Sequence, residues 1–122
     1  MRELKFRCFH KVDKKYYDLI GIDLEHGESV LRISGMPVVA SNKVLIIEQF
    51  TGLKDKNGVE IYEGDILKFG NGSNVEVEYS NGCFNVFNEP LGWDFDAEEN
   101  PVKASMKYCE IIGNIHENKE LL

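Results

Sequence analysis

The sequence has no long apolar run and few of the residues that carry specialised chemistry. No stretch approaches the roughly 20 apolar residues of a membrane-spanning helix, and the first residues alternate between polar and apolar types instead of forming a signal-peptide core. The three cysteines, Cys8, Cys83 and Cys109, share no Cys-x-x-Cys spacing, which argues against a zinc ribbon and a disulfide framework. We therefore expect a cytoplasmic protein with reduced, mostly buried thiols.

Positive charge is also scarce. The chain carries 21 acidic residues against 14 lysines and arginines, a net charge of −7, which opposes the nonspecific attraction to phosphate on which general nucleic-acid binding depends. The exception is the N-terminus, where a fold can gather basic side chains into a local patch. These residues are Arg2, Lys5, Arg7, Lys11, Lys14 and Lys15. The favoured alternative is a solvated basic stretch, because charged side chains usually face the solvent.

The length and the apolar content bound the architecture. With 122 residues, 43% of them hydrophobic, the chain is long enough for one core and falls in the range of a single domain. No repeat or linker divides it, so we expect one domain over residues 1–122.

Alternating polar and apolar residues predict strands along most of the chain. An opening hairpin is expected from Leu4–Cys8 and Tyr16–Asp23, a short strand at Ser29–Ser34 and a core strand at Val44–Phe50. Residues 53–67 predict an ordered loop that leads into a strand. Asn-Gly and Gly-Asn-Gly turns then separate three short apolar segments, a pattern typical of a meander: Ile66–Phe69, Val75–Tyr79 and Phe84–Phe87.

The C-terminal part is predicted with less regular structure. Residues 88–100 contain Pro90, Gly92 and four acidic side chains and indicate an irregular acidic loop, and a last strand is expected within Tyr108–Ile115. The rhythm of short strands and glycine turns predicts a mainly β protein, or an α+β protein with few helical residues. The expected architecture is a small bent antiparallel sheet or SH3-like barrel with an N-terminal hairpin extension.

The segment from Phe50 to Ile66, FTGLKDKNGVEIYEGDI, resembles the signature of the YopX family, small proteins encoded largely by bacteriophages and prophages. The start LKFR at Leu4–Arg7 and the end EIIGNIHEN at Glu110–Asn118 agree with it. Phe9, Phe50 and Lys119 depart from the residues often found there, tryptophan, tyrosine and proline. The resemblance implies a phage-derived bacterial protein with a mostly β fold, and it implies no particular reaction.

The residues that carry this resemblance suit turns and packing. They are Gly52, Leu53, Asp55, Gly58, Ile61, Tyr62, Glu63, Gly64, Asp65, Gly113 and Asn114. Glycine tolerates a positive φ, and aspartate at a turn accepts hydrogen bonds from neighbouring backbone N–H groups. We expect Gly64 to turn the chain with positive φ and Asp65 to accept backbone N–H groups where the next strand begins.

Catalytic and metal sites are not predicted. Asp55, Glu60, Glu63 and Asp65 can in principle bind a cation or act as acid and base, but their spacing lacks the bidentate glutamate of a calcium loop. The histidines at 10, 26 and 116 have no second ligand at zinc spacing. We therefore expect no metal, no cofactor and no catalytic residue.

Two aromatic side chains, Trp93 and Phe95, stand among aspartates and are the candidates for a partner-binding surface; the alternative is that they cap the core. The leading hypothesis is a noncatalytic phage accessory protein that binds another protein or self-assembles through exposed strand edges and this aromatic acidic loop. The alternative is a nucleic-acid-binding barrel whose basic N-terminal hairpin contacts phosphates. An enzyme that uses the acidic cluster is the third hypothesis.

Overall fold

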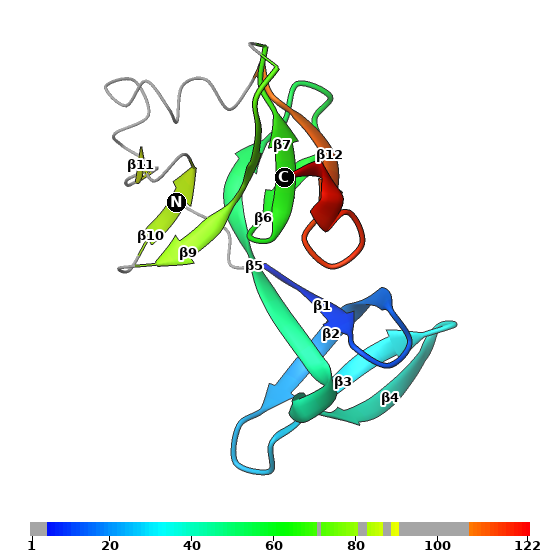
Figure 1. The fold of residues 1–122 in the computed structure, drawn as a ribbon. Coiled ribbons are helices and arrows are strands. Elements are labelled where there is room, and N and C mark those ends of the chain that lie inside the picture. The colour runs from blue at the N-terminus through cyan, green and yellow to red at the C-terminus, as the bar shows by residue number, and fades with distance from the viewer. Residues whose placement is uncertain (1–4, 71, 81–82, 87–88, 91–107) are drawn as a thin grey trace. The chain divides into compact units, whose positions relative to one another are not determined.

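The structure is a computed structural model, and it describes residues 5–70, 72–80, 83–86, 89–90 and 108–122. The chain divides into two compact units, an N-terminal unit of Lys5–Gln49 and a C-terminal unit of Met1–Leu4 with Phe50–Leu122 (Figure 1). Each unit is described by itself below. Within the described ranges, no helix is long and apolar enough to cross a membrane.

The N-terminal unit is an antiparallel sheet built from consecutive hairpins. Its strands are β1 (Phe6–His10), β2 (Lys15–Asp23), β3 (Glu28–Ile33), β4 (Met36–Ser41) and the first half of β5 (Leu45–Lys54), with the 3-10 turn η1 (Asn42–Val44) before β5. The hairpin order places β4 at one edge, followed by β3, β2, β1 and β5. Its core consists of Cys8, Leu31 and Leu45, which are buried beneath partly buried neighbours.

The C-terminal unit contains shorter strands in several small sheets. They are the second half of β5, β6 (Glu60–Tyr62), β7 (Asp65–Lys68), β8 (Asn74–Glu76), β9 (Glu78–Ser80), β10 (Cys83–Val86), β11 (Glu89–Pro90) and β12 (Glu110–Asn114), followed by the 3-10 turn η4 (Lys119–Leu121). Strand β7 lies between β12 and β8, and β10 lies between β11 and β9. The core of this unit is formed by Ile61, Leu67, Val77, Phe84, Val86 and Cys109.

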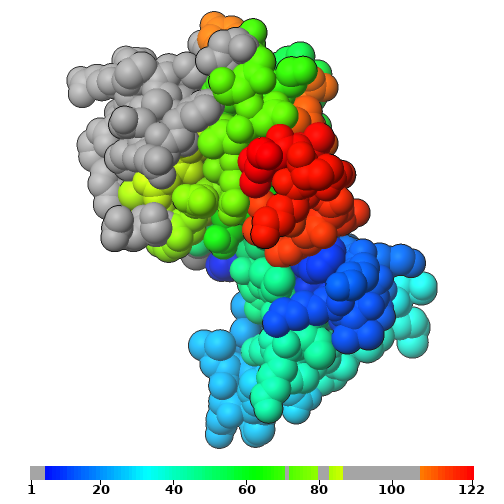
Figure 2. Space-filling view, in the orientation of Figure 1, coloured from blue at the N-terminus to red at the C-terminus, as the bar shows by residue number. Residues whose placement is uncertain are grey.

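The C-terminal tail packs on its own unit. The Asn74 side-chain amide donates to the Leu121 carbonyl at 3.0 Å, and Figure 2 shows the red atoms of the tail against the green atoms of the same unit. The tail forms a single 3-10 turn, as expected of a segment too short to be an independent helix.

The predicted mainly β class and the antiparallel sheets are confirmed, and most strand positions agree. The SH3-like barrel is not confirmed. Each sheet of the described strands has two free edges, so none of the sheets closes into a barrel. Residues 75–79 were predicted as one strand, but the structure divides this stretch at Val77: β8 pairs with β7, whereas β9 pairs with β10. One stretch of chain therefore contributes to two sheets.

Two strands were not predicted. Strand β6 lies inside the predicted loop of residues 53–67, and β4 begins at Met36, within a Gly-Met-Pro stretch for which no strand was predicted. Of the predicted acidic loop at 88–100, only Glu89–Pro90 is described, and it forms β11. Proline is tolerated in an edge strand because its missing N–H then costs no ladder hydrogen bond, which is why Pro37 and Pro90 did not prevent strand formation.

Candidate functional site

The sequence-predicted residues fall into two groups. Trp93 and Phe95 lie outside the described residues. The turn and packing residues of the YopX signature, from Gly52 to Asp65 together with Gly113 and Asn114, are all described, and all lie in the C-terminal unit. Their geometry decides whether this segment is a site or a structural element.

Asp55 lies at the centre of the signature loop and organises it. Its Oδ1 accepts the backbone N–H groups of Asn57 and Val59, both at 2.9 Å, and its Oδ2 accepts the N–H of Ile111 at 3.1 Å. The side chain is buried, with 6% of the residue exposed. Burial raises the pKa of Asp55, but the three N–H donors and the charge of Lys56 lower it more, so the net pKa is below the usual value.

The second turn of the signature has the predicted geometry. Gly64 has a φ of +87°, and Asp65 Oδ2 accepts the backbone N–H of Tyr62 at 2.8 Å. The Gly64 N–H donates to the Val77 carbonyl at 2.8 Å, while the Gly64 carbonyl accepts the Ile115 N–H at 2.9 Å. This single glycine therefore joins three segments of the unit.

Gly113 and Asn114 form the matching element near the C-terminus. A Cβ at Gly113 would lie 2.5 to 2.7 Å from atoms of the Asn118 side chain, so the backbone and that side chain are in close contact. Asn114 Oδ1 accepts the backbone N–H groups of His116 and Glu117, each at 3.0 Å. The turn after β12 is therefore closed by side chains of its own sequence.

In these contacts, side-chain oxygens of the signature accept hydrogen bonds from backbone N–H groups and hold the turns in place. Carboxylate oxygens of Asp55 and Asp65 face N–H groups of the chain, and no group of three or more His, Cys, Asp or Glu side chains within the described ranges is arranged to hold a metal ion. The Asn-Gly turn at Asn57–Gly58 also follows the expected pattern, with a φ of +79° at Gly58. The geometry of the signature therefore supports the interpretation as turns and packing.

Sequence reasoning missed a buried charged cluster in the N-terminal unit. Glu48, with 3% of the residue exposed, accepts from the Arg7 guanidinium at 2.9 Å and from the Tyr16 hydroxyl at 2.8 Å. The Arg7 guanidinium also lies 4.4 Å from the centre of the Tyr16 ring. The one signal in the sequence was an acidic residue inside the apolar run 44–50, because a buried charge needs a partner.

The cysteines are free thiols, as expected. Cys8 and Cys109 are buried and Cys83 is partly buried. Burial raises the pKa of Cys8 to about 11, with a further contribution from the charge of Glu48. Burial likewise raises the pKa of Cys109 to about 11, helped by the charge of Asp55. Since the thiolate is the nucleophilic form, both thiols are poor nucleophiles at neutral pH.

The most unusual surface of the N-terminal unit is the edge strand β4. Its sequence, MPVVAS, contains no charge, and Met36 and Val39 are 65% and 61% exposed. Strand β4 pairs with β3 and has no neighbour on its other side among the described strands. Proteins commonly protect such edges with charged residues, prolines, bulges or covering segments. Strand β4 has one proline, Pro37 near its start, and no charge, so the rest of this apolar edge is a candidate interface.

One hydrogen bond shows which residues of β4 direct their backbone N–H and carbonyl groups toward β3 and which direct them away. The Asn42 N–H donates to the Gly27 carbonyl at 2.8 Å, and the register pairs Glu28 with Ser41 and Val30 with Val39. Hydrogen-bonded and non-hydrogen-bonded pairs alternate along an antiparallel ladder. The backbone groups of residues 36, 38 and 40 therefore face β3, whereas those of residues 37, 39 and 41 face away from the sheet.

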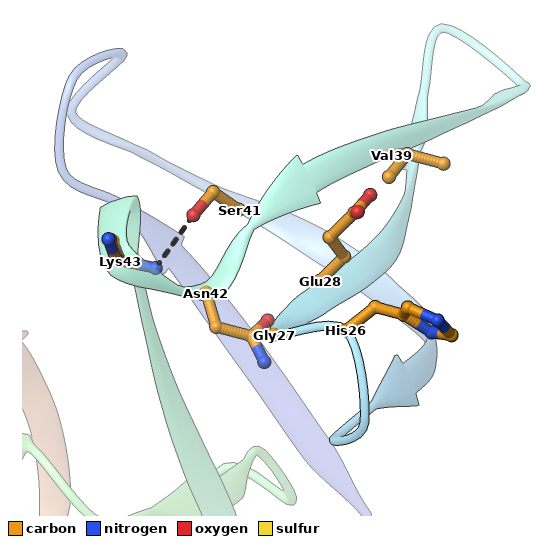
Figure 3. Close-up of a pocket in the computed structure, with 7 residues that line it drawn as sticks. All are labelled: His26, Gly27, Glu28, Val39, Ser41, Asn42 and Lys43. Atoms are coloured by element: carbon orange, nitrogen blue, oxygen red, sulfur yellow. Dashed lines mark hydrogen bonds between the residues drawn. The ribbon is translucent and has the colours of Figure 1, made fainter.

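A shallow hollow of about 590 Å³ adjoins this edge. Figure 3 shows its lining, which comes from the turn before β3, from the start of β3, from β4 and from η1: His26, Gly27, Glu28, Val39, Ser41, Asn42 and Lys43. Ser41 Oγ accepts the backbone N–H of Lys43 at 3.2 Å and begins η1. Val39 and Ser41 both line the hollow and present backbone groups on the outer side of β4. A strand added to this edge would therefore run along the hollow.

Comparisons with known proteins give a family match and a similar solved structure. The crystal structure of protein EF1440 from Enterococcus faecalis is similar, with a TM-score of 0.70 and 26% sequence identity over 100% of this chain and 99% of that chain. No curated protein matches the chain. The sequence pattern of the family described as YopX protein matches residues 5–122. The chain therefore belongs to the YopX family.

Proposed function

We propose that the chain is a noncatalytic phage accessory protein that works in the cytoplasm of a bacterial host and makes protein contacts by strand addition at β4. The observation that carries the proposal is the uncharged, exposed edge, whose outward backbone groups at residues 37–41 are positioned for another strand. In strand addition, main-chain hydrogen bonds supply affinity and exposed side chains supply specificity.

The engagement of the reactive side chains supports a noncatalytic role. Asp55 and Asp65 bind backbone N–H groups, and Glu48 is enclosed by Arg7 and Tyr16. Asp55 and Asp65 stabilise turns, and Glu48 forms a buried ion pair. All three side chains therefore stabilise the fold. The phage role is supported by the YopX resemblance, because proteins of this kind are encoded largely by phages and prophages.

The contacts of two basic side chains favour the protein-binding hypothesis over nucleic-acid binding. The Arg7 guanidinium is held by Glu48, and the Lys11 amine donates to the Lys43 carbonyl at 3.1 Å. Side chains engaged in this way must release a partner before they can contact a phosphate. An electrophoretic shift at low salt with single-stranded DNA or RNA would reverse this preference if it showed binding that salt weakens.

The test of the proposal compares two lysine substitutions. Val39→Lys introduces charge into the edge, and Val12→Lys makes the same change at a valine that is 70% exposed in the turn between β1 and β2. Tagged chains are purified from lysogenic cells after cross-linking. We expect a stoichiometric protein with the parent and Val12→Lys, reduced at least about tenfold with Val39→Lys, since an edge lysine opposes strand addition. Equal recovery with all three chains would contradict the role of β4.

A further inference from the structure

We infer that the strand added to β4 is β4 of a second copy of this chain, antiparallel and related by a two-fold axis at Val39. The inference rests on the proposed function, because it names the partner of the same edge. Two-fold dimers are the commonest oligomers, and their interface must be self-complementary. Both the backbone pattern and the side chains of β4 satisfy this condition.

The backbone pattern is complementary to itself in this register. The outward row presents carbonyls at Pro37, Val39 and Ser41 but N–H groups only at Val39 and Ser41, because proline has none. With Val39 opposite Val39 of the second copy, the two valines exchange both of their hydrogen bonds. Each Ser41 N–H then meets the Pro37 carbonyl of the other copy. The missing proline donors lie at the ends of the paired region.

Two other registers also pair outward-facing residues with outward-facing residues. In the register centred on Val38, Pro37 would lie opposite Val39, and each Val39 carbonyl would face a residue without an N–H. In the register centred on Ala40, Pro37 would lie opposite Lys43, which belongs to the 3-10 turn η1, so only residues 39–41 would pair. The register centred on Val39 pairs residues 37–41 of both copies and is therefore the longest that avoids the loss at proline.

The side chains complete the match. Val30 and Val39 lie opposite each other on β3 and β4, so the joined sheet would carry a continuous row of four valines across the axis. Cross-strand pairs of β-branched residues stabilise sheets. The neighbouring row runs from Glu28 through Ser41 to Pro37 and Arg32 of the second copy. It therefore has opposite charges at its two ends.

The decisive experiment uses two single-cysteine substitutions. In the inferred register Val38 lies opposite Ala40 of the second copy in a non-hydrogen-bonded pair, whose Cα atoms are about 4.5 Å apart. This separation is within the range of a disulfide, about 4.4 to 6.8 Å. We expect Val38→Cys mixed with Ala40→Cys, oxidised with diamide, to form a dimer whose 38–40 disulfide is mapped by mass spectrometry. Either variant alone, and Val12→Cys, should give at least about tenfold less dimer.

Sedimentation velocity of the purified chain supplies the second measurement and needs no cysteine variant. We expect the parent and Val12→Lys to become dimers as concentration rises about a hundredfold, and Val39→Lys to stay monomeric, because two lysines would face each other across the axis. A parent that stays monomeric overturns the inference. A disulfide in Val38→Cys alone or in Ala40→Cys alone also overturns it, because it indicates a register centred on that residue.

The two proposals fail in different ways. If the purified chain is monomeric but cells yield another protein that Val39→Lys loses, the second copy is wrong and strand addition at β4 stands. If cells yield no partner sensitive to Val39→Lys and the purified chain is monomeric, both are wrong.

Discussion

Replacing Asp55 by asparagine preserves the shape of the side chain but removes its charge and turns one acceptor oxygen into a donor. The remaining oxygen can accept from Asn57 and Val59, whereas the new amide group would face the N–H of Ile111, or the arrangement would be reversed. At least one buried N–H then loses its partner, and the others lose a charged acceptor. We expect the free energy of unfolding to fall by about 2–4 kcal/mol at pH 7.

The pH dependence of this loss follows from the lowered pKa. Because the pKa of Asp55 is lower in the folded than in the unfolded chain, the charged carboxylate stabilises the fold fully above the unfolded value of about 3.9. This contribution is lost as the pH falls through the folded pKa. The difference between parent and Asp55→Asn should therefore be largest near neutral pH and shrink below about pH 4.

Urea unfolding followed by circular dichroism between pH 2.5 and 7 measures this difference. Glu78→Gln is the control, since it removes an exposed carboxylate from the same unit and should change stability by less than about 0.5 kcal/mol. A difference that stays the same at every pH would refute the role assigned to the charge. If Asp55→Asn lowers the free energy of unfolding no more than Glu78→Gln does, the hydrogen bonds to Asp55 do not stabilise the fold as proposed.

Three further substitutions or treatments test other contacts. Gly64→Val should lower the free energy of unfolding by about 1–3 kcal/mol in urea titrations, because a branched residue is strained at a φ of +87°; an unchanged midpoint would contradict this. Gly113→Ala should lower the melting temperature through the clash with Asn118, and Gly113→Ala combined with Asn118→Gly should recover part of the loss if the clash is the cause. Iodoacetamide at pH 8 should modify Cys83 before Cys8, whose pKa is raised to about 11; peptide mapping that shows the opposite order would place Cys8 in an accessible environment.

The strength of the Arg7–Glu48 pair illustrates how burial changes the value of an interaction. The Glu48 side chain is 4% exposed and the Arg7 side chain 21%, so removing one partner leaves a poorly solvated charge. The exposed pair of Lys56 and Glu110, separated by 3.5 Å with both side chains about half exposed, contributes much less. The N-terminal unit therefore depends on a contact between β1 and β5 that no local pattern specifies.

The sequence by itself determined the local features of this protein. Positive φ at Gly64 follows from the Glu-Gly-Asp turn, and the capping by Asp65 spans only three residues, so propensity and turn chemistry were sufficient. The period-2 pattern likewise predicted most of the strands, because one buried face imposes alternation on the sequence; β4, β6 and the division between β8 and β9 were not predicted. These features depend on neighbouring residues alone.

Only the tertiary structure decided which distant segments meet. The bond from Ile111 to Asp55 joins residues 56 positions apart, and β4 became the open edge because β3 pairs with β2 on its other side. Pairing over such separations depends on the packing of the whole unit, and several registers satisfy the same local pattern. Pro37 fits into β4 because β4 is an edge strand: the proline nitrogen faces away from β3, where a missing N–H costs no ladder hydrogen bond.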